Sequence, residues 1–445
     1  MVIEKIKKYL TSQVSIAPLV IFRIAFGILM SASIIRFIYM GWVEKMYILP
    51  KVYFPFFGFE WIKPLPALGM YIVFGLLLIT ALFILIGFLY RISTISFFLL
   101  FTYVELIDKT NYLNHYYFIS LISLILIFLP AGKAFSLDNK VFKRNDIKST
   151  YRYFIFLPQL QMFTLYFFAG VAKINYDWLI EAQPLKIWLP AYSHFPFIGS
   201  LLEKTWIAYF FCWFGCIYDL CIGFLLFNKR TVYFAYFLVI VFHMATSLLF
   251  NIGMFPYIMM TITIIFFKEK FHIAILNFLE KITNYSTTNR IEKNNSLHPI
   301  IKYAFIVFFV VQFLMPFRYA LYDGKLFWTE QGYRFSWRVM LMEKAGTAFF
   351  FVEDKKSGKR IEIDNKDYLT YMQEKMVSTQ PDMMIDYAKF LKEEYNKKGL
   401  SDIQVKVQSY VTLNGSGTRE FIDPTVDLSL ETNNIFKNKN WIRSY

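Results

Sequence analysis

The 445-residue sequence contains only three cysteines, Cys212, Cys216 and Cys221, and all three lie within one apolar run. No disulfide framework can therefore hold an exported polar region together, and we expect these cysteines to be buried small apolar residues. The sequence also lacks a glycine-rich phosphate-binding loop, a zinc-site spacing and a basic recognition helix. These absences argue against nucleic-acid binding and a zinc site, and we expect no metal cofactor.

Acidic residues are few, with 32 Asp and Glu against 47 Lys and Arg and a net charge of +15. The basic residues fall mainly in loops between apolar runs, which is the placement expected beside anionic lipid headgroups. Hydrophobic residues make up 57% of the chain, above the ~45–50% that is usual in soluble domains. The composition predicts a polytopic α-helical membrane protein surrounded by membrane lipid.

Apolar runs that approach the ~20 residues needed to span a bilayer number about nine. They cover about 16–40, 68–90, 92–107, 115–130, 153–172, 206–227, 231–250, 255–267 and 301–317. Cytoplasmic loops carry the excess of Lys and Arg, and this rule favours a cytoplasmic N-terminus. The N-terminal segment has no small-residue cleavage site, so we expect an uncleaved anchor. An odd number of spans then places the chain after about residue 317 on the extracytoplasmic face.

We therefore expect a transmembrane helical domain at residues 1–317 and a small extracytoplasmic α+β domain at residues 318–445. In the second domain the sequence predicts two strands around the turn Ser357-Gly358, a helix at Asp382–Lys398 and a strand at Gln404–Leu413. The polar segment 269–297 is expected to be a cytoplasmic loop.

Lys173 follows directly after the apolar run that ends at Ala172. A charge at the bilayer centre costs at least ~2.5–3.5 kcal/mol, which makes such a residue a functional candidate; the alternative is a lysine that snorkels to the surface. Asp219 and Arg23 also lie within apolar runs, where interhelical pairing, for example of Asp219 with an Arg, is the structural alternative. His243 is either a packing residue or a substrate contact.

The outer loop that contains Asp108 and His115 is expected on the same membrane face as Lys173. An Asp or Asn in this loop could act only as a helix cap. Eight segments can then be compared, in order, with a known family. They are Tyr90–Ser93, Leu106–His115, Tyr166–Trp178, Asp219, Phe242–His243, Phe250–Phe255, Tyr333–Trp337 and Phe421–Asp427.

On these segments the sequence resembles the vitamin K-dependent gamma-carboxylase family, in a bacterial form. The resemblance implies an inner-membrane enzyme that oxidises a reduced naphthoquinone of the vitamin K or menaquinone type to its epoxide with dioxygen. The strong base formed in this reaction carboxylates glutamate in a protein or peptide with carbon dioxide. Many relatives have a lysine pair where this chain has Ala172-Lys173.

Residue by residue, the resemblance implies that Lys173 is the base and that His115, with Asn114 beside it, contacts the oxygenated quinone. The quinone site would also include His243, Phe255 and Met259. The glutamyl substrate would approach Tyr333 and Trp337, and Arg338 or Lys344 could pair with its carboxylate.

The chemistry is consistent with these roles. The γ-proton of glutamate is too weakly acidic for any side chain, so the energy must come from oxygenation of the hydroquinone. Lys173 need only accept a phenolic proton, near pKa ~10 by analogy with tyrosine, and it can do so only as a free amine, which desolvation favours. His115 could stabilise negative charge, and apolar walls would exclude water.

Two other functions remain compatible with the residues. One is a quinone-binding or quinone-epoxidising membrane protein without carboxylase activity. The other is a non-enzymatic scaffold or transporter whose buried charges line a pathway, although the sequence contains no internal repeat.

Overall fold

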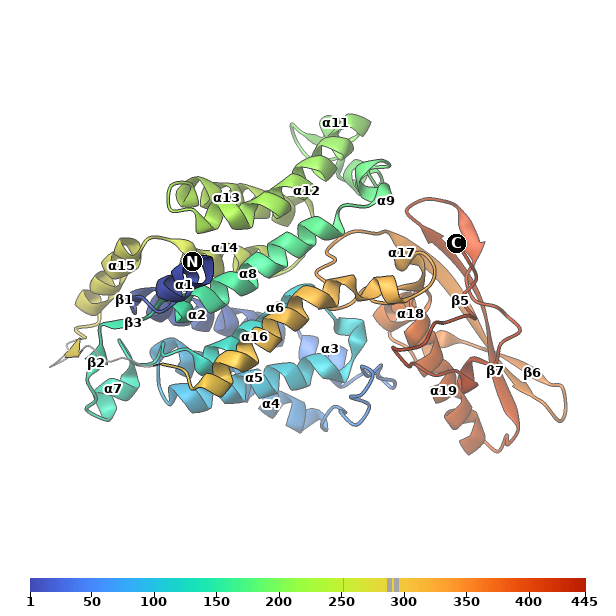
Figure 1. Cartoon of the computed structure of the whole chain (residues 1–445). Coiled ribbons are helices and arrows are strands. Elements are labelled where there is room, and N and C mark those ends of the chain that lie inside the picture. Colours follow the sequence, from blue (N-terminus) through green and yellow to red (C-terminus); the bar gives the residue numbers. More distant parts are fainter. Residues whose placement is uncertain (251, 286–289, 292–295) are drawn as a thin grey trace.

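Long apolar helices run side by side through most of the chain, and a smaller region with a β-sheet lies beyond one end of them (Figure 1). The computed structural model describes residues 1–445 except residues 251, 286–289 and 292–295. Seven helical segments among the described residues are long and apolar enough to cross a membrane. They are α2 (Ala17–Tyr39), α4 (Ala67–Ile86), α5 (Tyr90–Ile107), α8 (Arg152–Ala172), α12 (Thr205–Phe227), α13 (Val232–Leu249) and α16 (Pro299–Leu314) continued by η4 (Met315–Leu321).

Two of the nine expected spans are shorter helices. They are α6 (Asn114–Phe128) and α14 (Phe255–Ile262), which continues as the 3-10 helix η3 (Thr263–Phe266). The N-terminus lies at one end of the helical region and the C-terminal sheet beyond the other (Figure 1). The chain is therefore a polytopic α-helical membrane protein with a C-terminal α+β region.

Short elements connect the long helices. They are α1 (Val2–Leu10), α3 (Trp42–Tyr47), η1 (Lys109–Asn111), α7 (Leu137–Val141), α9 (Tyr176–Leu179), α10 (Leu185–Trp188), η2 (Leu189–Tyr192), α11 (Gly199–Leu202), α15 (Glu269–Ile282) and α17 (Leu326–Thr329). Two small sheets add β1 (Gln13–Ser15) paired with β3 (Ser149–Tyr151), and β2 (Asp146–Ile147) paired with β4 (Arg290–Ile291).

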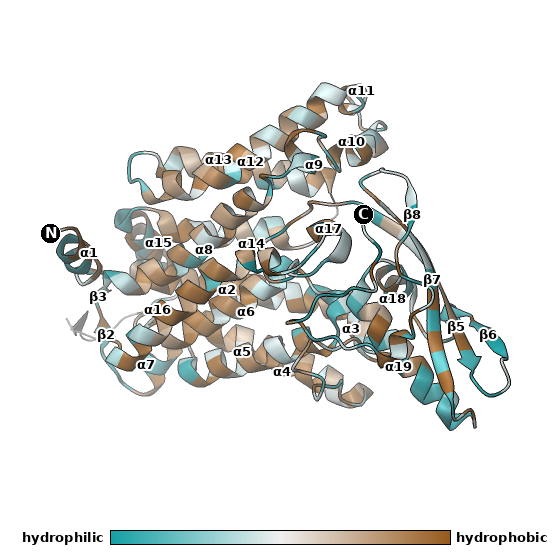
Figure 2. Cartoon of the chain, turned by 45° about the vertical axis from the view of Figure 1, so that its right-hand side comes forward, coloured by the Kyte–Doolittle hydropathy of each residue, from teal (hydrophilic) through white to brown (hydrophobic). Residues whose placement is uncertain are grey.

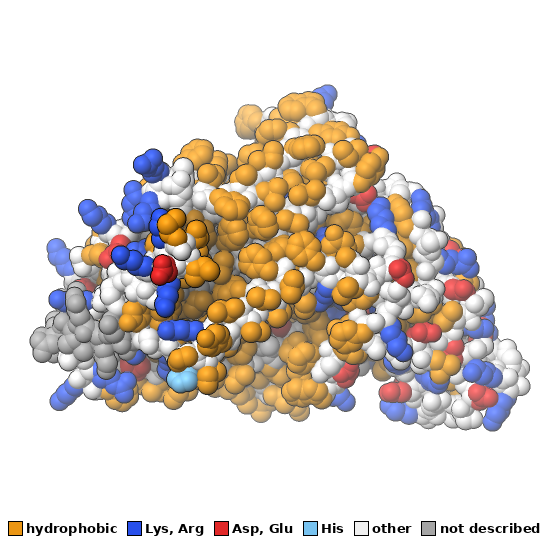
Figure 3. Space-filling view, in the orientation of Figure 1, with side chains coloured by type: hydrophobic (Ala, Val, Ile, Leu, Met, Phe, Trp, Pro, Cys, Tyr) orange, Lys and Arg blue, Asp and Glu red, His pale blue; other side chains and the backbone are white. Residues whose placement is uncertain are grey.

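The surface of the helical region is apolar, as the hydropathy colouring and the space-filling view show (Figures 2 and 3). Exposed apolar side chains are the expected lipid contacts of membrane helices. One correction concerns Cys221, which is exposed on α12 whereas Cys212 and Cys216 are buried. Another concerns segment 269–297, which is not all loop: Glu269–Ile282 forms helix α15, with His272 and Leu276 buried. The rest of that segment is only partly described.

The C-terminal region contains a four-stranded antiparallel sheet in the order β6-β5-β7-β8. Its elements are β5 (Lys344–Asp354), β6 (Arg360–Ile363), η5 (Asn365–Asp367), α18 (Tyr371–Val377), α19 (Pro381–Lys397), β7 (Ile403–Leu413), β8 (Thr418–Glu420) and η6 (Leu428–Leu430). Helix α19 buries Met384, Tyr387 and Leu391 at helical spacing, and the Tyr387 ring packs 4.8 Å from that of Phe350 in β5. The predicted strands and helix in this region correspond to β5, β6, β7 and α19.

Candidate functional site

Lys173 directly follows the last residue of helix α8, and its side chain is buried against helix α12. The Nζ atom donates a hydrogen bond of 2.6 Å to Asp219 Oδ2 and a longer one of 3.3 Å to the carbonyl oxygen of Ala169. Both charged side chains are almost inaccessible, at 6% and 5% exposure. Asp219 therefore forms an interhelical pair, but its partner is Lys173 and not the arginine given as an example.

A glycine in α8 brings the lysine and the carboxylate together. A Cβ atom on Gly170 of α8 would lie 2.7 Å from the backbone nitrogen of Leu220 in α12, so only glycine permits this close approach. Gly215, one turn before Asp219, faces the Lys173 stem, whose Cε would lie in ordinary contact, at 3.8 Å, with an added Cβ. The local sequence of both helices thus places the ion pair.

The ion pair lies at the edge of a cavity of about 330 Å³, which we call the lysine cavity. It is enclosed by α8, α12, α13 and the segment before α14. The aromatic residues that line it are Tyr166, Trp178, Trp188, Phe210, Phe211, Phe214, Phe242, Phe250 and Phe255. Within this largely apolar space, the Lys173–Asp219 pair supplies the charge.

His243 of α13 also lines the lysine cavity, and its Nε2 lies 3.1 Å from the Tyr166 hydroxyl. Its buried Nδ1 has no hydrogen-bond partner in the described part of the chain. The ring of Phe255 lies between two histidines, with centroid distances of 5.6 Å to His243 and 5.8 Å to His115. Phe255 is thus in contact with both histidines, which the family resemblance assigns to one quinone site.

His115 faces a second cavity of about 630 Å³, which we call the interface cavity because membrane helices and the C-terminal region both line it. Ile252, Phe255, Val339 and Met340 line both cavities and form the wall that they share. Lys173 and His115 therefore occupy adjoining cavities rather than a single one.

Four further residues expected near the quinone or the glutamyl substrate line the interface cavity: Asn114, Tyr333, Arg338 and Lys344. The Asn114 side-chain amide donates to the Arg338 carbonyl oxygen at 2.9 Å. The Arg338 guanidinium lies 4.6 Å from the Tyr319 ring, and burial lowers its pKa. Among the described residues it has no carboxylate partner, so it presents an uncompensated positive charge.

Two protein-family models match the amino-acid sequence of the chain. A family model described as the HTTM domain matches residues 12–271, and a model described as the vitamin K-dependent gamma-carboxylase lumenal domain matches residues 297–445. The chain belongs to the vitamin K-dependent gamma-carboxylase family. This membership implies vitamin K as the cofactor. No solved structure matches the chain significantly.

Not every residue expected in the gamma-carboxylase site lines a cavity. Met259 is fully buried in the core of the helical region and lines neither the lysine nor the interface cavity. Trp337 is also fully buried, with its ring stacked 4.9 Å from Tyr117. Lys344 does line the interface cavity, but it pairs at 2.8 Å with Glu330, so its charge is already balanced.

Arg23 and Asp108 bond to the backbone near helix ends. Arg23 donates to the carbonyl oxygens of Ala131 and Phe135 at 3.1 and 2.6 Å. Asp108 accepts a 2.8 Å hydrogen bond from the Thr110 amide, and burial raises its pKa to about 6. Among the described residues, no group of three or more His, Cys, Asp or Glu forms a metal-binding arrangement.

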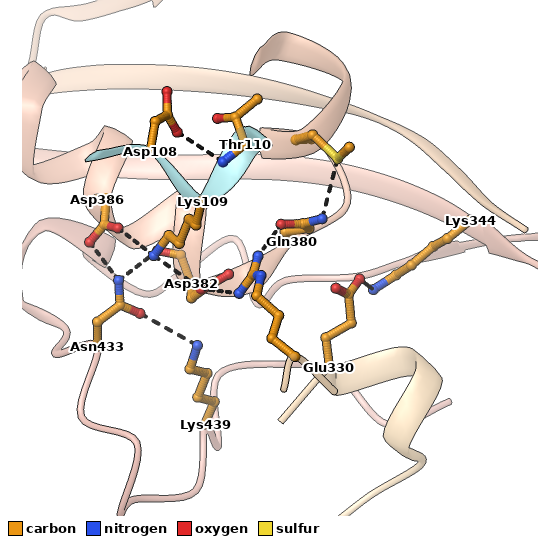
Figure 4. Close-up of polar contacts among 12 residues, drawn as sticks. Asp108, Lys109, Thr110, Glu330, Lys344, Gln380, Asp382, Asp386, Asn433 and Lys439 are labelled. Atoms are coloured by element: carbon orange, nitrogen blue, oxygen red, sulfur yellow. Dashed lines mark hydrogen bonds and ion pairs between the residues drawn. The ribbon is translucent and has the colours of Figure 1, made fainter. Parts of the chain in front are cut away.

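A buried charge network, which no sequence pattern indicated, links the helical region of this gamma-carboxylase family member to its C-terminal region (Figure 4). Lys109 Nζ lies 3.0 Å from Asp382 and 2.7 Å from Asp386, both on α19. Arg334 pairs with Asp382 at 2.7 Å. Burial alone would raise the pKa of Asp382, but Arg334 and Lys109 lower it well below its usual value. These residues are 48 or more positions apart in sequence except within α19, so no local pattern could reveal their pairing.

Proposed function

We propose that this protein is a vitamin K hydroquinone-dependent gamma-glutamyl carboxylase. It would convert a reduced naphthoquinone to its epoxide with dioxygen and carboxylate a protein or peptide glutamate with carbon dioxide. The observation that carries the proposal is the buried Lys173–Asp219 pair at an apolar cavity that adjoins a polar one. The quinone, when bound, supplies the oxygen-dependent chemistry that generates the strong base.

The lysine cavity has the properties that a naphthoquinone ring requires. Its volume of about 330 Å³ lies within the ~300–1,000 Å³ range of small-molecule sites, which are mostly apolar with a few polar groups. The unpartnered His243 Nδ1 and the Lys173–Asp219 pair are polar groups that could orient quinone oxygens. The aromatic walls exclude water, which would otherwise quench a strong base.

A lipid-soluble quinone also needs a route from the bilayer. Phe210, Phe214 and Val241 line the cavity and are 54%, 38% and 46% exposed on the apolar outer surface. The cavity thus adjoins the surface that lipid covers, between α12 and α13. This position supports entry from the membrane rather than from water.

Asp219 changes how Lys173 would act as a base. A carboxylate 2.6 Å away stabilises the ammonium form, so burial alone does not supply a free amine. In a water-poor site the proton of the pair can move from Nζ to Asp219, which leaves a neutral amine that accepts the phenolic proton. We propose that Lys173 holds the proton taken from the hydroquinone and that Asp219 sets its charge state.

The interface cavity would receive the glutamyl side chain. Arg338 offers an unpaired guanidinium for the glutamate carboxylate, and charge-assisted hydrogen bonds of this kind are the stronger ones. His115 has no hydrogen-bond partner among the described residues, and its ring touches Phe255 in the shared wall. His115 is therefore placed to stabilise charge on an oxygen that reaches the wall. Carbon dioxide and dioxygen are uncharged and need no ionic site.

The distribution of charge supports the orientation expected from the sequence. Lys and Arg side chains gather at the end of the helical region that lies away from the C-terminal sheet (Figure 3). Because the cytoplasmic side carries the excess of positive charge, we propose a cytoplasmic N-terminus and an extracytoplasmic C-terminal region, in a bacterial inner membrane.

The test uses purified full-length protein in detergent with reduced vitamin K, dioxygen, labelled bicarbonate and a glutamate-rich peptide. We expect epoxide and labelled peptide from the wild type and neither from Lys173→Met/Asp219→Asn. This double variant removes both charges, so it leaves no unpaired buried ion and should fold. Lys186→Ala is the matched control, because Lys186 bonds to the Tyr209 hydroxyl outside the cavity.

Undiminished epoxide from the folded double variant would overturn the assignment of the base. Epoxide without labelled peptide in the wild type would instead favour quinone oxidation without carboxylation. Loss of activity in Lys186→Ala would show that the assay responds to general disturbance rather than to the ion pair.

A further inference from the structure

A third cavity, of about 620 Å³, lies far from the proposed reaction site. It is formed where α5 begins and where α7 and β2 follow the end of α6, at the same end of the molecule as the N-terminus (Figure 1). Arg91, Lys133, Lys143 and Arg144 line it, and we call it the basic cavity. Among the described residues that line it, Asp138 is the one carboxylate.

Asp138 forms no ion pair with Arg91, Lys143 or Arg144, and both of its oxygens accept hydrogen bonds from backbone amides. Oδ1 accepts from the Leu89 amide at 2.7 Å and Oδ2 from the Tyr90 amide at 3.0 Å, where helix α5 starts. In the part of the chain that the structure describes, Arg91, Lys143 and Arg144 have no carboxylate within ion-pair distance. The three cations Arg91, Lys143 and Arg144 therefore outnumber the single carboxylate of Asp138, and the basic cavity carries a net positive charge.

The walls of the basic cavity are fixed rather than loose. The Asn139 side-chain amide donates to the Lys133 carbonyl oxygen at 3.0 Å and to Asp146 at 2.6 Å. The Arg144 amide donates to the Asn139 carbonyl oxygen at 2.8 Å. Gly132 packs so closely on Tyr90 that an added Cβ would lie 2.5 Å from the ring. The cations are thus presented on a framework that is already in place.

The cavity also has an apolar side that continues along a membrane helix. Ile92 lines it and is 62% exposed. Ile95 and Leu99 follow at helical spacing on α5 and are 41% and 59% exposed. A ligand that fits both parts has an anionic head and a hydrocarbon chain.

We propose that the basic cavity binds the headgroup of one anionic phospholipid, with an acyl chain along Ile92, Ile95 and Leu99. The phosphate would accept charge-assisted hydrogen bonds from Arg91 and Arg144. Basic pockets between membrane helices on the cytoplasmic side bind such headgroups, and this end carries the Lys and Arg side chains that gather in Figure 3. A free anion would leave the apolar stripe without a partner, so the lipid explains both parts.

The experiment titrates the full-length protein in neutral detergent with dioleoyl phosphatidylglycerol or dioleoyl phosphatidylcholine and counts bound lipid by native mass spectrometry. We expect phosphatidylglycerol to bind about tenfold more tightly, because Arg91 and Arg144 favour an anionic headgroup. Arg91→Gln/Arg144→Gln should reduce this affinity about tenfold. Lys229→Gln/Arg230→Gln is the matched control, because both residues are exposed on the α12–α13 loop at the same end.

Equal affinity for the two lipids, or an unchanged affinity in Arg91→Gln/Arg144→Gln, would overturn the proposal. A competition arm separates the two sources of phosphate. If millimolar inorganic phosphate displaces the bound phosphatidylglycerol, the cavity recognises phosphate alone and the lipid assignment fails. If phosphate displaces none, the chain contacts along α5 contribute to binding, as proposed.

Discussion

At the scale of single residues, the charge partners of the buried cations decide what each cation is able to bind. Lys173 has Asp219 at 2.6 Å, and Lys344 has Glu330 at 2.8 Å. Arg338 has an aromatic ring instead of a carboxylate. Of these three, Arg338 is the one whose full charge is available to an incoming anion.

We expect Arg338→Gln to raise the KM for a glutamyl peptide about tenfold or more, because a hydrogen bond to a charged group contributes about 1.5–3 kcal/mol. The kcat should change much less, since Arg338 would bind the carboxylate throughout the reaction. Steady-state carboxylation at varied peptide concentration measures both constants. Lys375→Gln, an exposed residue that lines the same cavity, is the control, and an equal KM change in both variants would contradict a specific role.

Asp108 makes a pH-dependent contribution to stability. Burial raises its pKa from 3.8 to about 6, so the folded protein holds this proton more tightly than the unfolded chain. Its contribution is therefore largest below about pH 4 and decreases by about 3 kcal/mol as the pH rises to about 6. Asp108→Asn keeps an acceptor for the Thr110 amide but removes the titration. The wild-type minus variant free energy of unfolding should fall across this window, and a flat difference would contradict the prediction.

At the scale of elements, the contact between α8 and α12 positions the ion pair. Substitution of Gly170 by alanine should separate the two helices, because the added Cβ would lie 2.7 Å from a backbone nitrogen that has little freedom to move. We expect a loss of about 1–3 kcal/mol of stability and a large loss of epoxide formation.

Gly75 provides the matched control for this helix contact. It lies within membrane helix α4, and an added Cβ would meet nothing within 4 Å. Gly75→Ala should therefore be neutral or slightly stabilising, since alanine favours the helix by about 1 kcal/mol. Thermal unfolding in detergent compares the two variants, and similar melting temperatures for both would show that the Gly170 contact is not tight.

Elements with a strong local pattern could be predicted from the sequence, whereas those without one could not. Strand β7 (Ile403–Leu413) alternates buried and less buried residues along its length, and α19 repeats its apolar residues at helical spacing. Helix α15 was expected to be loop because the segment 269–297 is polar and rich in Asn and Thr. Its buried face packs mainly against another helix, α2, and partly against β1, and both are distant in the sequence.

At the scale of the whole molecule, contacts between distant segments hold the two regions together. One hydrophobic cluster joins Trp178 and Leu249 of the helical region to Phe350 and Val407 of the sheet. The family resemblance selected Lys173 and His115 as site residues, but it did not reveal that Phe255 stands between their cavities. Nor could composition or spacing show that Asp219 faces Lys173, because 46 residues separate them.

Lys109 links the helical region to α19 through its ion pairs with Asp382 and Asp386. Lys109→Met would leave Asp382 and Asp386 with less compensation in a buried site, and breaking such a pair costs about 3–5 kcal/mol. We expect α19 and the preceding loop to become more accessible in hydrogen-exchange measurements while the membrane helices stay protected.

Lys51→Gln is the control for this link. Lys51 also bridges to the C-terminal region, through the Asp367 carbonyl oxygen at 2.7 Å, but it is exposed. Its removal should change stability by less than about 0.5 kcal/mol. An equal rise in hydrogen exchange for both variants would show that the buried network stabilises α19 no more than an exposed hydrogen bond does.

The wall formed by Ile252, Phe255, Val339 and Met340 has a kinetic consequence. Under the proposed function, the quinone arrives from the lipid side and the peptide from the side of the C-terminal region. Neither substrate has to pass the other on its way in or out. Binding order would then be random, and an unproductive quinone could be exchanged while a long protein substrate stays in place, so several glutamates of one chain could be modified in a single encounter.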